Sequence, residues 1–247
     1  MKRLPVVALV VANLFVAAET VRHEWGYYET LLIFWCEALV IGGYNLLRLL
    51  VVGFACEAPF GETLSARIEM SPGFRIFATL VGTGFYAIKF GGFALAVGFL
   101  VVALPAFSVP EGAGGRQVLM GLKSAAPGVG WSTLVLLLSH GASFVVNFLR
   151  GGEYKRMPLF LLIFWPYMRM WLVLVVLAAG AVLMALFPGL VGATAFAVVM
   201  VLAKLLADLL SHTMEHAWIG RQEVRGPEVP PVVPHPAGTP APPIVGR

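Results

Sequence analysis

The amino-acid sequence predicts an all-α integral membrane protein, a helical bundle with about six transmembrane helices and both termini in the cytoplasm. Mean hydropathy is +0.87 over 247 residues. Only 12% of the residues are charged, about half the share found in soluble domains. Several apolar stretches reach the roughly 20 residues that a helix needs to cross a bilayer. These three observations make the lipid bilayer the first expected partner.

The first half of the chain predicts three helices. The first is expected at residues 4–18, with Pro5 at its start, where the missing N–H does no harm. This stretch also resembles a cleavable signal peptide, although an uncleaved span fits the topology better. A second helix is expected at 29–54 and a third at 75–104, which Pro105 would end.

The second half predicts three more helices. A glycine-, proline- and serine-rich stretch at 106–130 indicates a loop, followed by a fourth helix at 131–149. The segment 158–187 is long for one span and contains Pro166. We therefore expect an interfacial or re-entrant piece at 158–165 and a fifth span at 166–187. The turn FPG then leads into a sixth helix at 190–217.

The domain organisation expected is a transmembrane bundle at 1–219 and a disordered cytoplasmic tail at 220–247. From residue 226 on, eight of 22 residues are proline, a composition that favours an extended polyproline-type chain over a packed core. Such a tail suggests a cytoplasmic partner of the SH3-like kind. No basic stripe is interleaved with aromatic residues, so no nucleic-acid partner is expected. Cys36 and Cys56 form no metal or disulfide motif and are interpreted as inert.

The distribution of Lys and Arg predicts the orientation in an inner membrane. Six alternating helices place nine basic residues on one side of the membrane and three on the other. Because basic residues collect on the cytoplasmic side, both termini are expected there. The larger set is Lys2, Arg3, Arg67, Arg75, Arg150, Lys155, Arg156, Arg221 and Arg225; the smaller is Arg22, Arg116 and Lys123.

Polar residues recur at helical spacing inside the expected spans, which predicts one polar interior formed mainly by helices two, four and six. A charge at bilayer depth costs at least ~2.5–3.5 kcal/mol and normally faces a partner. A rise of 1.5 Å per residue suggests two layers, with Glu37 and His140 about 12–14 Å from the outer ends and Lys204 and Asp208 about 21–27 Å in. The polar residues are Glu37, Tyr44, Asn45 and Arg48; Lys89; His140, Ser143 and Asn147; and Lys204, Asp208, His212 and His216.

The spacing of Asp208, His212 and His216 suggests a metal site. Residues at i, i+4 and i+8 share one helical face, and carboxylate and imidazole ligands suit zinc or a similar divalent ion. His140 and Glu37 are further candidate ligands. A metal-bound water would support a membrane-embedded hydrolase-like activity. In that hypothesis Asn45, Asn147, Lys204, Lys89 and Ser143 are supporting polar residues.

Two alternatives use the same residues without a metal. In one, the ionisable side chains form a path for protons or a polar solute, as intramembrane charges often do. In the other, they pair with one another in a non-catalytic membrane scaffold, beginning with Lys204 and Asp208 at i, i+4. The sequence leaves these alternatives open.

Three segments carry a family resemblance: EALVIGGYNLLRLL (37–50), SHGASFVVNFLRGGEYKR (139–156) and LAKLLADLLSHTMEH (202–216). Together they resemble an uncharacterised family of bacterial multi-pass membrane proteins, domain of unknown function 6498, over about residues 29–219. The resemblance brings no activity with it. It implies that the motif positions are Glu37, Asn45, His140, Asn147, Asp208, His212 and His216.

Overall fold

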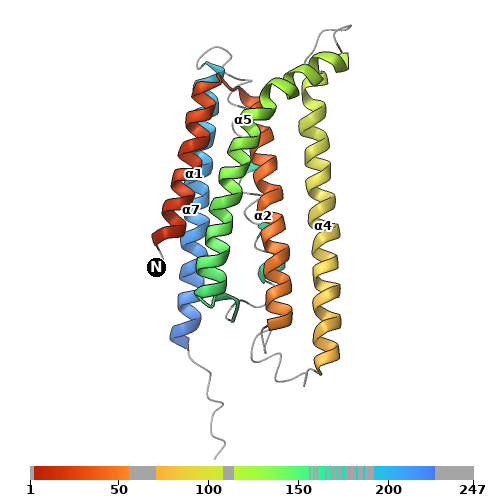
Figure 1. The fold of residues 1–247 in the computed structure, drawn as a ribbon, viewed down its shortest axis with the longest axis vertical. Helices are drawn as coiled ribbons and strands as arrows, with labels where there is room; N and C mark the ends of the chain where they lie inside the picture. The colour runs from red at the N-terminus through yellow and green to blue at the C-terminus, as the bar shows by residue number, and fades with distance from the viewer. Residues whose placement is uncertain are drawn as a thin grey trace, which may run out of the picture.

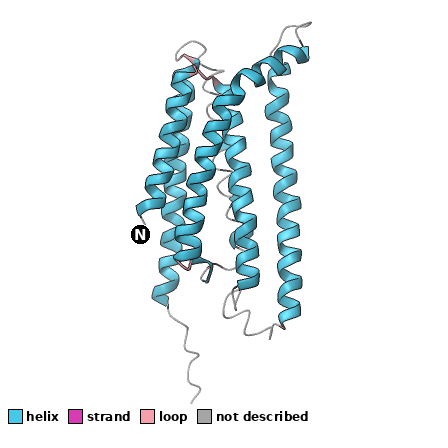
Figure 2. Ribbon diagram, viewed as in Figure 1, coloured by secondary structure: helices cyan, strands magenta, loops and turns pink. Residues whose placement is uncertain are grey.

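The computed structural model describes residues 3–55, 71–107, 114–155 and 192–225, together with separate residues between 157 and 186. The described part is helical and contains no strand (Figure 2). The predicted all-α fold is therefore confirmed. The chain from 226 onward, which includes the proline-rich tail, lies outside the described residues.

Five helices of the described part are long and apolar enough to cross a membrane. This number is compatible with a membrane protein. Helix α5 passes directly into a π-helical segment, η1, and a short 3-10 helix, η2, follows. The elements are α1 (Arg3–Arg22), α2 (Tyr27–Ala55), α4 (Pro72–Phe107), α5 (Gly114–Ser143), η1 (Phe144–Arg150), η2 (Glu153–Lys155) and α7 (Ala193–Arg225).

Helices α1, α2, α5 and α7 form a four-helix group, and α4 stands at its edge against α2 (Figure 1). We call the end of the bundle that holds the α1–α2 turn the upper end. From there α2 runs down, and α4 runs up beside it. Helices α5 and α7 both run from the upper to the lower end (Figure 1). They therefore point in the same direction.

The expected loop at 106–130 is wrong for residues 114–130, which belong to α5. Pro127 lies inside this helix, and a proline there removes one backbone hydrogen bond and can bend the helix without ending it. Figure 1 shows α5 bending near its upper end. Gly128 does not mark a turn either: a Cβ there would lie 2.6 Å from the Trp25 ring, so the glycine admits the indole.

Other helix ends also differ from expectation. Helix α4 continues past Pro105 to Phe107, so the proline does not end it. Helix α7 extends beyond the expected residue 217 to Arg225. The expected pieces at 158–165 and 166–187 lie largely outside the described residues, and the exact count of six helices is not established by the described part.

Two apolar clusters form the core. The upper cluster joins all five long helices and the α1–α2 turn through residues such as Val16, Trp25, Ile33, Leu136 and Val201. The lower cluster joins α2, α4 and η1 with the described residues Met157, Leu159 and Leu162. It includes Leu49, Tyr86, Phe90 and Phe148. The candidate site lies on the same helices as the upper cluster.

Glycines bring α2 and α4 close together. A Cβ at Gly42 would lie 2.1 Å from the Phe90 ring, and one at Gly53 would lie equally close to the Thr79 side chain. Above these glycines, the Trp35 indole crosses to α4 and donates a hydrogen bond to the Ala94 carbonyl at 2.8 Å. Small residues at a helix interface permit this close approach in membranes.

Candidate intramembrane charge cluster

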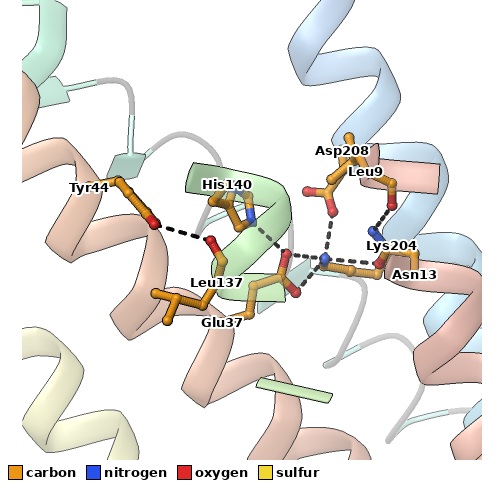
Figure 3. A network of polar contacts seen from close by, with 8 residues as sticks. All are labelled: Leu9, Asn13, Glu37, Tyr44, Leu137, His140, Lys204 and Asp208. Carbon is orange, nitrogen blue, oxygen red and sulfur yellow. Dashed lines mark hydrogen bonds and ion pairs between the residues drawn. The ribbon is translucent and has the colours of Figure 1, made fainter. Parts of the chain in front are cut away.

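Five polar side chains from four helices meet inside the bundle. Asn13 comes from α1, Glu37 from α2, His140 from α5, and Lys204 and Asp208 from α7 (Figure 3). We refer to these five residues as the charge cluster. Three helices that lie far apart in the sequence thus supply charged or titratable groups to one position.

Lys204 lies at the centre of the charge cluster. Its Nζ forms ion pairs with the carboxylates of Glu37 and Asp208 and donates a hydrogen bond to Asn13 Oδ1 at 3.1 Å (Figure 3). An ammonium has three N–H donors and no acceptor. The three neighbouring side chains thus present oxygen atoms to a group that can only donate. The same Nζ lies 6.0 Å from the centroid of the Phe34 ring, within cation–π range.

The sequence of α7 explains why this face is buried. Ala197, Met200 and Val201 are buried one and two turns before Lys204, and Ala207 is buried beside Asp208. The apolar stripe at i, i+3, i+4 and i+7 thus continues directly into the ion pair. The charged pair lies on the face that α7 packs against α1 and α2.

His140 is joined to the cluster through Glu37. Its Nε2 lies 3.3 Å from Glu37 Oε1, so one carboxylate contacts both the imidazole and the ammonium. The side chain of His140 is 12% exposed, against 2% for Glu37, 3% for Lys204 and 1% for Asp208. His140 is therefore the most accessible charged or titratable member of the cluster.

Asn13 is held in place by its own helix. Its Nδ2 donates to the Leu9 carbonyl at 3.0 Å, while its Oδ1 faces Lys204. The sequence analysis missed this residue. The available signal was its position as a lone amide inside the apolar run ALVVANLFVAA, since a buried polar side chain in a span normally has a partner.

The charge cluster forms one layer near the middle of the bundle. Glu37 is ten residues from the start of α2, and Lys204 is eleven from the start of α7. Both lie about 15–17 Å below the upper helix ends. The expectation that Lys204 lies in a deeper layer than Glu37 is wrong. Helix α7 begins only at Ala193, and the long Lys204 side chain reaches Glu37.

The other predicted polar residues lie elsewhere. Asn45 belongs to the lower half, where its Nδ2 donates to the Leu162 carbonyl at 2.8 Å. Asn147 is buried in η1, and Ser143 is half-buried at the end of α5. Lys89 is exposed on α4, with its Nζ 5.9 Å from the centroid of the Phe85 ring.

Tyr44 braces the helix that carries His140. Its hydroxyl donates to the Leu137 carbonyl at 3.1 Å (Figure 3). A Cβ at Gly141 would lie 2.5 Å from that hydroxyl, so the glycine beside His140 leaves room for the tyrosine. The predicted polar faces of helices two and four therefore do meet.

The predicted metal ligands are only partly described. Glu37, His140 and Asp208 converge, whereas the side chains of His212 and His216 lie outside the described residues. Within the described part, no group of three His, Cys, Asp or Glu side chains is arranged to hold a metal ion. The ammonium of Lys204 lies between the two carboxylates, where a bound cation would otherwise lie.

Comparison with known proteins decides the family. Residues 1–224 match the sequence profile of a family of unknown function, DUF6498. The chain belongs to this family. The DUF6498 match starts at residue 1 and so includes α1 and Asn13, which the three quoted motifs leave out. No curated protein and no solved structure matches the chain. The function must therefore be argued from the charge cluster.

Proposed function

We propose that this DUF6498 protein is a proton-coupled membrane carrier whose charge cluster binds one proton at mid-depth and passes it on. The observation that supports this proposal is the position of Glu37, which contacts both the Lys204 ammonium and the His140 imidazole. Such a carboxylate can pair with either cation. Intramembrane ionisable groups in contact commonly serve proton relays.

The described cluster contains a group that can take up a proton. Two of its members are carboxylates, one is an ammonium and one is an imidazole, whose unprotonated ring nitrogen can accept a proton.

The contacts suggest how the proton would move. An imidazolium at His140 donates its Nε2 proton to Glu37 Oε1 across the existing contact, which leaves a neutral imidazole and a neutral carboxylic acid. Lys204 then keeps its ion pair with Asp208 alone. The net charge of the cluster does not change in this step. The Glu37–Lys204 contact between α2 and α7 weakens, and this couples the proton to the packing of two helices.

Proton flux into vesicles tests the proposal. The purified protein is reconstituted in liposomes that contain a pH-sensitive dye, and a potassium diffusion potential is imposed. We expect flux above that of empty vesicles, and a loss of at least about tenfold in Glu37→Gln, because removing a group that relays the proton removes the step itself. Glu19→Gln is the matched control and should retain flux, because Glu19 pairs with Arg22 and His23 outside the charge cluster. Equal flux in wild type and empty vesicles would contradict proton transfer.

A divalent-metal site with hydrolase-like activity is the second candidate. It is favoured by the convergence of Glu37, His140 and Asp208, with His212 one helical turn further along α7. Binding of an ion by both carboxylates would require Lys204 to leave the position between them. Elemental analysis of the purified protein distinguishes the candidates. About one metal ion per chain in wild type, lost in Glu37→Gln/Asp208→Asn, would support a metalloprotein.

The connection between α5 and α7 supports six spans in an inner membrane. Both helices run from the upper to the lower end (Figure 1), and we infer from this that the chain between them crosses the membrane once more. One such crossing added to five membrane-length helices makes six. The described basic residues at the lower end are Arg75, Arg150, Lys155, Arg221 and Arg225. By the positive-inside rule, we infer that this end and both termini lie in the cytoplasm.

A further inference from the structure

A lysine lies exposed in the middle of α4. Lys89 is 17 residues after Pro72 and 18 before Phe107, about 26 Å from either end of the helix. Its neighbour Phe90 packs on Gly42, which lies near the middle of α2. Its position along α4 and the contact of Phe90 with α2 both put Lys89 midway between the two ends of the bundle.

The ammonium is too deep to reach water along the bilayer normal. A lysine stem extends over about one helical turn, ~5 Å, and lysines that snorkel lie near helix ends. Charged side chains at the bilayer centre normally face an interior and have a partner. Lys89 instead shares the outer side of α4 with exposed Phe85 and Ile88.

The described helices offer no carboxylate at that place. Their acidic residues nearest to mid-depth, Glu37 and Asp208, are buried and already pair with Lys204. The sequence from 157 to 203 contains no Asp or Glu. Within the described residues, Lys89 contacts the Phe85 ring and forms no ion pair. Its counter-charge must come from another molecule.

We propose that the outer face of α4 around Lys89 docks a transmembrane helix of a different membrane protein, one that carries an Asp or Glu at mid-depth. Charge complementarity selects this partner. A second copy of the chain would bring another Lys89, and its Glu37 and Asp208 would already be paired with its own Lys204. Gly92, one helical turn after Lys89 on the same face, has open space where a Cβ would lie, so a partner helix can approach this face closely.

A designed helix serves as the probe. We would synthesise a polyleucine transmembrane peptide with one central Glu, and matched peptides with Gln or Leu at that position. Each labelled peptide is reconstituted with the labelled full-length protein in phosphatidylcholine vesicles, and association is measured by energy transfer. We expect the Glu peptide to bind wild type on the order of tenfold more tightly than the Leu peptide.

Substitutions at Lys89 locate the effect. The ratio of the affinities for the Glu and Leu peptides should fall to about one in Lys89→Met. It should stay near the wild-type ratio in Lys89→Arg. Equal binding of the Glu and Leu peptides to wild type would overturn the proposal, and so would a preference that survives in Lys89→Met. A wild-type dimer cross-linked through α4 would also overturn it, since a second copy would then be the occupant. Proton flux is measured separately, so failure here leaves the proposed function untouched.

Discussion

At the scale of single residues, the charge cluster is built around one buried ammonium. Lys204 contacts two carboxylates and one neutral amide, that of Asn13. Two carboxylates within reach of one ammonium repel each other as soon as that ammonium is lost. The stability of the cluster therefore depends more on Lys204 than on any other member.

Removal of Lys204 should destabilise the protein strongly. Lys204→Met keeps the length of the side chain but leaves two buried carboxylates without their shared cation, and breaking a buried pair in this way costs about 3–5 kcal/mol. We expect a corresponding loss in the free energy of unfolding, measured by denaturation in mixed micelles. The triple variant that adds Glu37→Gln and Asp208→Asn should recover most of it. A single variant as stable as wild type would contradict the pairing.

Asn13 should contribute less, because it accepts one hydrogen bond from a charged donor. Loss of such a bond costs about 1–3 kcal/mol, so Asn13→Leu should lower unfolding stability by that amount. Leu14→Ala, at the exposed neighbouring position, is the control and should change stability by less than half as much. If the two variants behave alike, Asn13 has no special role in holding Lys204.

The residues of this cluster were predictable to different degrees. Periodicity identified Glu37, His140, Lys204 and Asp208 as interior residues because each continues a helical face with other polar groups. Asn13 has no such companion on α1 and was missed. Lys89 was grouped with the interior residues because depth alone was considered, whereas only packing tells which side of α4 faces the bundle.

At the scale of helices, the apolar blocks predicted where spans occur, and packing decided where they end. Residues 114–130 have the composition of a loop, yet Ala125 and Val129 are buried in the upper cluster. That burial offsets the low helix propensity of the glycines and Pro127. The π-helical η1 had no signal in the sequence pattern, since a change of helical period over seven residues leaves the hydropathy unchanged.

The α2–α4 contact gives a prediction with an adjacent control. Gly42→Ala places a methyl group where the Phe90 ring lies, whereas the Cβ of Gly43→Ala meets open space. Overpacking of a well-packed contact costs about 1–3 kcal/mol, so Gly42→Ala should lower unfolding stability by about that much. Gly43→Ala should be neutral or slightly stabilising, because alanine favours a helix over glycine. Equal effects at the two positions would argue against the close approach.

At the scale of the whole molecule, the parallel course of α5 and α7 leads to an odd number of crossings between them. The described helices place the α1–α2 turn and the start of α7 at one end, and η2 and the start of α4 at the other (Figure 1). Basic residues collect at the second end, so it should face the cytoplasm. The charge distribution predicts an orientation that stays a prediction, while the direction of each helix required the structure.

Cysteine accessibility in intact cells tests this arrangement. In a background with Cys36→Ala and Cys56→Ala, a membrane-impermeant maleimide should label His23→Cys and Gly192→Cys from outside. Ser71→Cys and Lys155→Cys should react only after the membrane is permeabilised, because they lie at the basic end. If Gly192→Cys and Lys155→Cys react from the same side, the chain between them does not cross, and the protein has five spans. Reversal of all four results would keep six spans but place both termini outside, against the charge bias that predicts the opposite.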